Sequence, residues 1–83
     1  MRIRINDKSY GPAQLETCMK ALARETGHSI VLKARRNGWT ANIGCAKEES
    51  VAAGPWLALV DAVYHYAGPD ATEWIWLEKE TRS

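Results

Sequence analysis

One dipeptide, Asn37-Gly38, restricts what this chain can fold into more than any other feature of its sequence. It lies inside His28–Ala46, a stretch rich in strand-forming residues. Asn-Gly in that setting predicts a two-residue type I′ turn, because both central positions of such a turn need positive φ. We therefore expect an antiparallel hairpin in which Arg36 faces Trp39 across the turn.

This register predicts a hairpin with two chemically different faces, because side chains alternate along a strand. The apolar face collects Ile30, Leu32, Ala34, Ala41, Ile43 and Cys45. The polar face collects Val31, Lys33, Arg35, Thr40, Asn42 and Gly44. We expect the apolar face to join the core and the polar face to stay open.

Two further strands are predicted near the two ends of the sequence. Met1–Asn6 alternates strictly, with Met1, Ile3 and Ile5 on one face, and Asp7–Gly11 reads as a polar loop. Glu73–Glu80 is predicted to be the last strand. Its faces are Trp74, Trp76 and Glu78 on one side and Ile75, Leu77 and Lys79 on the other.

Two helices are predicted from proline starts, apolar periodicity and glycine ends. The first runs from about Pro12 to Thr26 and ends at Gly27. The second begins at Pro55 and ends before Gly68-Pro69. The apolar stripes are Leu15, Cys18, Met19 and Leu22 in the first helix and Trp56, Leu59, Val60, Val63 and Ala67 in the second, widened by Leu57, Tyr64 and Tyr66.

The element order strand, helix, strand, strand, helix, strand predicts an α+β fold with ferredoxin-like βαββαβ topology. We expect a four-stranded antiparallel sheet with two helices on one face and the other face open. Eighty-three residues, 46% hydrophobic and 25% charged, suit a single globular domain spanning residues 1–83.

The composition excludes several classes of protein. No run of about 18 apolar residues suggests a membrane span, and MRIRIND lacks the apolar region of a secretory signal, so we expect a cytoplasmic protein. Cys18 and Cys45 lie far apart without CxxC spacing, so we expect reduced, buried thiols and no disulfide, metal site or cofactor.

The open sheet face is the candidate binding surface. If Ile75 and Leu77 turn toward the helices, two tryptophans share that face with basic residues from the first strand and the hairpin. Aromatic rings among cations suit either base stacking or a protein-binding hot spot. The opposite arrangement, with the tryptophans filling the core, remains an alternative. The expected partner-binding residues are Arg2, Arg4, Lys33, Arg35, Trp74 and Trp76.

Charge is also unevenly distributed along the sequence. Residues 1–46 carry eight Lys or Arg against three Asp or Glu, and residues 47–83 carry three against seven, so the halves have balances of +5 and −4. Such asymmetry either marks a partner-binding surface or is compensated when the halves interleave in one fold.

Signatures of catalysis and of ordinary RNA recognition are weak. Asp61 and His65 have i, i+4 spacing but no visible third partner, and Asp7 is a single carboxylate after a strand. The expected third strand, Gly38–Cys45, reads GWTANIGC and lacks the stacking aromatics of an RNA-recognition motif. We therefore predict no enzyme and no catalytic residues.

The segments Gly38–Ala41 (GWTA) and Pro55–Ala62 (PWLALVDA) resemble small phage proteins of the ABA-sandwich type. In those proteins a Trp-bearing strand leads through a loop to a Pro-initiated, Ala-rich helix. The resemblance covers less than half of the chain and brings no catalytic residues with it. It implies a compact phage-encoded protein, and such proteins often block a host protein or nucleoprotein machine, as anti-CRISPR proteins do.

The leading hypothesis is therefore a non-enzymatic binding protein, a phage-encoded inhibitor of a host defence complex that acts by protein or nucleoprotein binding. The alternative is a nucleic-acid-binding module that uses the basic and aromatic sheet face. The same face could also serve as a homodimer seam.

Overall fold

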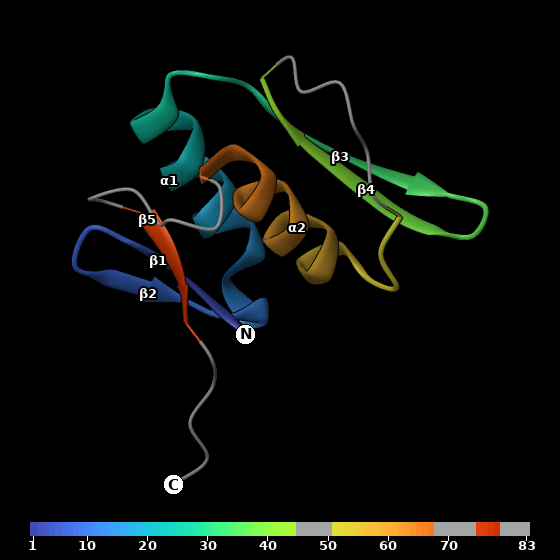
Figure 1. Ribbon diagram of the computed structural model, residues 1–83, viewed down its shortest axis with the longest axis horizontal. Coiled ribbons are helices and arrows are strands. Elements are labelled where there is room, and N and C mark those ends of the chain that lie inside the picture. The colour runs from blue at the N-terminus through green and yellow to red at the C-terminus, as the bar shows by residue number, and fades with distance from the viewer. Residues whose placement is uncertain (45–50, 68–74, 79–83) are drawn as a thin grey trace, which may run out of the picture.

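The computed structural model in Figure 1 describes residues 1–44, 51–67 and 75–78 and has a mixed α and β architecture. Pro12 and Pro55 begin helical segments and Gly27 ends one, as the sequence suggests. The elements in chain order are β1 (Arg2–Ile5), β2 (Lys8–Tyr10), the 3-10 helix η1 (Pro12–Gln14), α1 (Leu15–Thr26), β3 (Ile30–Arg35), β4 (Gly38–Ile43), α2 (Pro55–Ala67) and β5 (Ile75–Glu78).

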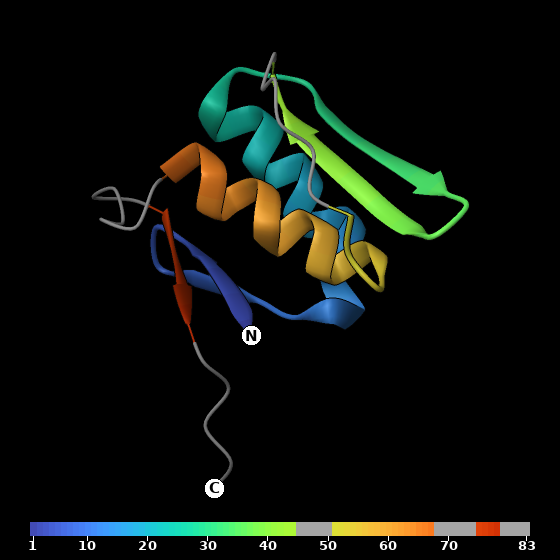
Figure 2. The same cartoon turned by 45° about the vertical axis from the view of Figure 1, so that its right-hand side comes forward.

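The helices form a middle layer between two separate sheets. One sheet has the strand order β2-β1-β5, and the other is the β3-β4 hairpin. Figure 1 and Figure 2 show α1 and α2 lying between the three-stranded sheet on one side and the hairpin on the other. Among the described strands, the expected single four-stranded sheet is therefore not seen.

The strand β2 explains why the ferredoxin-like order is not confirmed. That order would place the β4 segment beside β1. In the structure β1 pairs with β2 along one edge and with β5 along the other, both antiparallel. Both edges of β1 are thus occupied, and the hairpin packs on the opposite side of the helices instead. The expected neighbourhood of β1 and β5 is confirmed.

The segment expected as a loop, Asp7–Gly11, contains this additional strand. Ile5 pairs with Lys8, so Asn6 and Asp7 form a two-residue turn, and Asn6 adopts a φ of 57°. Asparagine tolerates this left-handed conformation better than most residues. Tyr10 then turns into the core with 7% of its surface exposed.

The predicted β3–β4 hairpin is confirmed, but its register differs by two residues. The turn is Arg36-Asn37, and Gly38 already pairs with Arg35. Asn37 lacks the positive φ of a type I′ turn, whereas Gly38 has a φ of 153°. A two-residue shift preserves side-chain parity, so the predicted faces survive. The new cross-strand pairs are Ala34 with Trp39, Leu32 with Ala41, and Ile30 with Ile43.

The glycine at position 38 serves a close approach rather than a turn. A Cβ there would overlap the carbonyl oxygen of Ala52 and lie 2.8 Å from Val51 Cγ1. Next to it, Trp39 and Ala52 exchange two backbone hydrogen bonds, both 2.8 Å long. The segment after the hairpin is thereby fastened to the outer edge of β4.

The first helix forms over the predicted residues. Pro12 opens it as a 3-10 turn, and Gly27 ends it with a φ of 72° while its N–H donates to the Ala23 carbonyl. Cys18 and Leu22 are buried, and Leu15 and Met19 pack beside them. The predicted apolar stripe is confirmed.

Helix α2 lies at the centre of the core. Leu59 and Val63 have no exposed surface, and the small residues Ala58 and Ala62 are buried beside them. The prediction that three further residues widen the apolar stripe of this helix is wrong. Leu57, Tyr64 and Tyr66 are 49%, 48% and 40% exposed. The buried arc is wide because sheets cover α2 from both sides. Within the described residues, no helix is long and apolar enough to cross a membrane.

Candidate binding site on the β3–β4 hairpin

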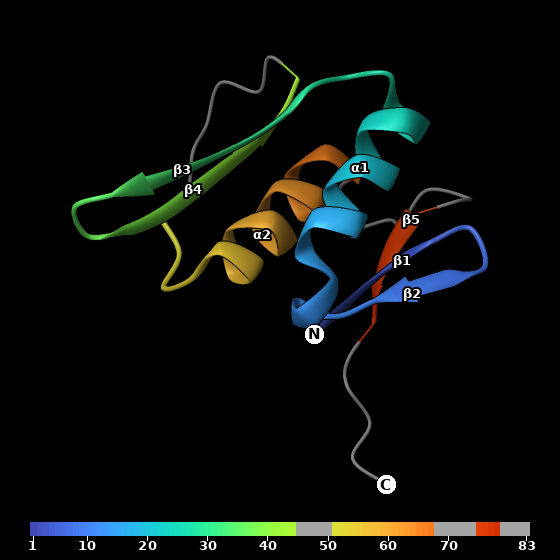
Figure 3. The same cartoon turned by 180° about the vertical axis from the view of Figure 1, so that it is seen from behind.

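The expected site residues that the structure describes are divided between two sheets. Arg2 and Arg4 belong to β1, whereas Lys33 and Arg35 belong to β3. The helix layer separates these two strands, as the rear view in Figure 3 also shows. Trp74 lies outside the described residues. The structure therefore does not unite the basic residues of the two strands in one patch.

The aromatic component of the expected site is described only through its strand. Position 76 lies in β5 opposite Arg4, and position 78 lies opposite Arg2. The neighbouring Ile75 has no exposed surface, and Leu77 packs against the core. The inward placement of this pair is confirmed, while the side chain of Trp76 lies outside what the structure describes.

The β1 arginines bind within their own sheet. Arg2 Nε donates to Ser9 Oγ at 2.8 Å, and its Nη2 donates to the Ser9 carbonyl at 3.2 Å. Its guanidinium also lies over Gly11, where an added Cβ would be 2.7 Å from Nη1. Arg4 Nε donates to the Asn6 carbonyl at 3.3 Å. These contacts give both half-buried arginines a role in joining β1 to β2 and its turn.

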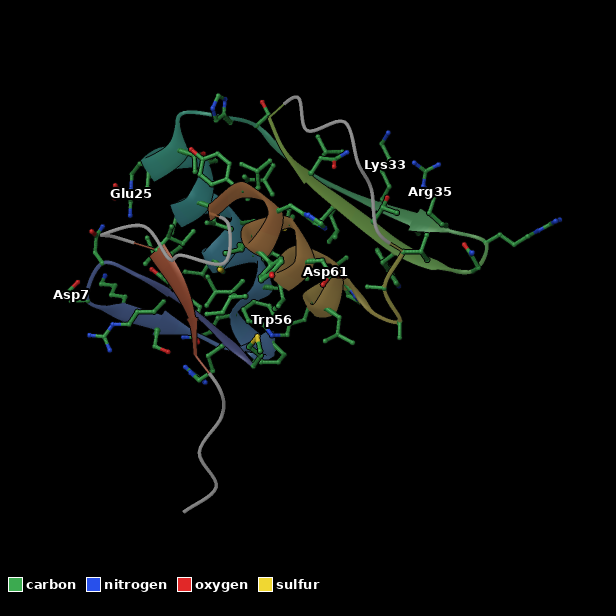
Figure 4. All side chains as sticks on the ribbon, viewed as in Figure 1. Asp7, Glu25, Lys33, Arg35, Trp56 and Asp61 are labelled. Atoms are coloured by element: carbon green, nitrogen blue, oxygen red, sulfur yellow. The ribbon has the colours of Figure 1, made fainter. Side chains whose placement is uncertain are left out.

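The hairpin presents a different kind of surface, which we call the basic arm and define as Lys33, Arg35 and Arg36. All three residues are exposed. In Figure 4, Lys33 and Arg35 extend from the hairpin on the side away from α2. Ile30–Ile43 contains these three cations and no acidic residue. The hairpin segment itself therefore carries a net positive charge.

The apolar face of the hairpin holds the arm in place. Ala41 and Ile43 are buried, and Trp39 is half-buried against the same core. Beyond this anchored part, the turn reaches past the helices in both Figure 1 and Figure 2. The arm is therefore a projecting hairpin with a fixed base.

The polar face of the hairpin is only partly accessible. Thr40, expected on an open face, is 2% exposed, and its Oγ1 accepts a hydrogen bond from Arg35 Nε at 3.3 Å. Asn42 is half-buried. The accessible part of this face thus belongs to β3 and the turn, with β4 contributing little.

Sequence reasoning missed Arg36 as a site residue. The expected register placed it opposite Trp39, inside the paired region, whereas the structure places it in the exposed turn. The signal that could have found it is the run of three cations without a carboxylate in Ile30–Ile43. Charge pattern indicates Arg36 as a candidate, whereas the expected strand register did not.

A second exposed surface lies along α2. Leu57, Asp61 and Tyr64 follow i, i+4, i+7 spacing and so share one side of the helix. Asp61 is half-buried, and the adjacent His65 is exposed with its ring 6.0 Å from that of Tyr64. Asp61 and His65 thus lie one turn apart at the surface of the same helix.

The other candidate metal-binding and catalytic residues do not form a cluster within the described part of the chain. Within residues 1–44, 51–67 and 75–78, no group of three or more His, Cys, Asp or Glu residues is placed to hold a metal ion. Cys18 is a free, buried thiol, and burial raises its pKa to about 12. Cys45 lies outside the described residues. Asp7 sits in the exposed β1–β2 turn.

Comparisons with known proteins give no relative for this chain. No family model, curated protein or solved structure matches it. A proposal for the function of this protein therefore rests on the chemistry of its own surface residues.

Proposed function

We propose that this protein is a non-enzymatic binding protein that docks onto an anionic surface through the basic arm. The observation that carries the proposal is the exposure of Lys33, Arg35 and Arg36 at the projecting end of an anchored hairpin. Clustered positive charge raises the rate of encounter with an anionic partner and orients the approach.

The fixed base of the arm strengthens this proposal. Docking costs less conformational entropy when the contacting element is already ordered. Here Trp39 is joined to Ala52 by two backbone hydrogen bonds, and Ile43 is buried in the core. The anchored hairpin therefore presents the three cations of the basic arm on an already ordered scaffold.

The resemblance to small phage proteins extends the proposal to a biological role. A compact binding protein of that kind can inhibit a host defence complex by occupying the surface on which the complex acts. Nucleoprotein complexes offer anionic surfaces that match the basic arm. We accordingly propose an inhibitor of a host nucleoprotein complex.

A capture experiment with charge-matched variants tests the proposed function. The double variant Lys33→Gln/Arg36→Gln removes two charges from the arm. The control Lys20→Gln/Arg24→Gln removes two charges from α1, where the side chains are 77% and 75% exposed. We expect the arm variant to lose most partner capture from a host lysate while the control behaves like the parent protein.

The outcome that contradicts the proposal is equal capture by the two double variants. Far-UV circular dichroism of both variants establishes that each is folded before capture is compared. Nuclease treatment of a parallel lysate shows whether the retained material depends on nucleic acid.

A further inference from the structure

We infer that the ligand of the basic arm is double-stranded DNA, and this inference rests on the proposed function. The shape of the arm suits a DNA groove. The accessible part of the β3–β4 ribbon is β3 and the turn, which project past the helices, while the polar face of β4 is largely covered. The major groove of B-form DNA, about 12 Å wide, admits a two-stranded antiparallel ribbon.

The chemistry of the exposed residues also suits DNA. Lys33 and Arg35 occupy alternate positions of β3, so they extend from the same face about 7 Å apart along the strand. Arg36 and Asn37 follow in the exposed turn. Cations suit phosphate oxygens, and the amide and guanidinium groups of the turn also suit base edges.

The β3–β4 hairpin lacks a fully exposed aromatic residue. Protein-binding hot spots are built around buried aromatic anchors, and single-stranded nucleic acids are gripped by stacking on aromatic rings. Within Ile30–Ile43 the one aromatic residue, Trp39, packs half-buried against the core. The exposed chemistry therefore favours the backbone of a duplex over an apolar protein surface or unpaired bases.

Duplex RNA fits this arm less well than DNA. The major groove of A-form RNA is deep and narrow, and side chains cannot read it. A ribbon whose cations lie along one strand and at its turn needs the wider groove of B-form DNA. The basic arm therefore fits duplex DNA, bound through its phosphates.

Counterion release predicts how steeply the affinity for DNA falls with salt concentration. Binding that neutralises Z phosphates has a log-log salt slope of roughly −0.9Z for B-form DNA. With two or three cations engaged, we expect a slope of about −2 to −3. For three cations the affinity falls about 40-fold between roughly 50 and 200 mM salt.

The test is fluorescence anisotropy with a labelled DNA duplex of mixed sequence, about two helical turns long. Titrations of the intact protein over a range of salt give the slope. We expect Lys33→Gln/Arg36→Gln to bring the slope about 1.8 closer to zero. The control Lys20→Gln/Arg24→Gln should leave the slope unchanged, because it alters charge on α1 rather than on the hairpin.

Three comparison ligands separate the alternatives: duplex RNA of the same sequence, single-stranded DNA and poly-L-glutamate. Tighter binding to duplex DNA than to each of them supports the inference. Absence of DNA binding at low salt, or a salt slope that the arm variant does not change, overturns it. Arm-dependent binding to poly-L-glutamate in preference to DNA overturns this inference and leaves the proposed function standing, whereas failure of the capture experiment removes both.

Discussion

Gly38 is the residue at which β4 comes closest to another segment of the chain. Its missing side chain makes room for the Ala52 carbonyl, and its φ of 153° is one that other residues rarely adopt. The backbone pairing between Trp39 and Ala52 follows directly beside it. One hydrogen atom in place of a side chain thus permits the contact that fastens the outer edge of the hairpin.

Replacing this glycine should be costly, because Gly38→Ala adds both backbone strain and a steric overlap. The control Gly27→Ala also sits at positive φ but would meet nothing within 4 Å. We expect the loss in unfolding free energy for Gly38→Ala to exceed that for Gly27→Ala by about 1–3 kcal/mol. Urea denaturation measures both, and equal losses would contradict the close approach.

The thiol of Cys18 should be protected from alkylation. Burial raises its pKa to about 12, so at pH 8 only about one thiol in 10⁴ is ionised, and the thiolate is the reactive form. In a Cys45→Ser background, we expect native protein to react with iodoacetamide far more slowly than urea-unfolded protein. Labelling of native protein at the rate of a free thiol would contradict this prediction.

The sign of the pH dependence follows from the same burial. The folded state holds the Cys18 proton more tightly than the unfolded chain, in which the thiol has its ordinary pKa of 9.0. The contribution of this thiol to stability is therefore complete below pH 9 and declines as the pH rises toward 12. Comparison with Cys18→Ala isolates that decline from the titration of other groups.

At the scale of the element, the two hairpins turn through asparagines in different conformations. Asn6 has a φ of 57°, whereas Asn37 has a negative φ and precedes a glycine that serves another purpose. Sequence pattern placed Asn6 at the end of the first strand, with a loop beginning at Asp7, and predicted the second turn as type I′. Local pattern does not reveal the role of Gly38, because its close approach is to Ala52, a residue distant from the turn in sequence.

Glycine substitutions distinguish the two turns. Asn6→Gly should be neutral or stabilising, because glycine relieves the strain of positive φ. Asn37→Gly should lower the unfolding free energy by about 0.5–1 kcal/mol, because glycine only adds entropy to the unfolded chain. Urea midpoints measure the two effects, and a stabilising Asn37→Gly would indicate the type I′ turn after all.

At the scale of the whole molecule, sequence pattern located most elements but not their arrangement. Proline starts, glycine ends and apolar periodicity, through Cys18 and Leu22 in α1 and through Leu59 and Val63 in α2, identified both helices, since these signals are local. The division into two sheets depends on β2, a three-residue strand, occupying an edge of β1. β2 thus takes the edge of β1 that the predicted fold assigned to β4, and local sequence pattern does not show which of the two segments pairs there.

The candidate site shows the same limit. The exposure of Lys33 and Arg35 agrees with the predicted faces, because parity survives the two-residue shift in register. Their expected union with Arg2 and Arg4 depended on all strands sharing one sheet. Once the sheets separate, the charge pattern within one hairpin is the part of the prediction that the structure supports.

The central position of α2 predicts contrasting effects for two leucines on the same helix. Leu59 has no exposed surface, whereas Leu57 is 49% exposed. We expect Leu59→Ala to cost about 2–5 kcal/mol of unfolding free energy and Leu57→Ala less than about 1 kcal/mol. Both substitutions change helix propensity equally, so calorimetric or urea data report burial. Similar losses would contradict the layered core.

The pairing of Ile5 with Ile75 has a consequence for how the molecule folds. These residues are 70 positions apart, whereas Arg35 and Gly38 in the other sheet are 3 apart. Closing the longer loop loses more chain entropy before any contact rewards it, and such distant pairings slow folding. We therefore expect the β3–β4 hairpin to form early and the docking of β5 on β1 to complete folding in its slowest step.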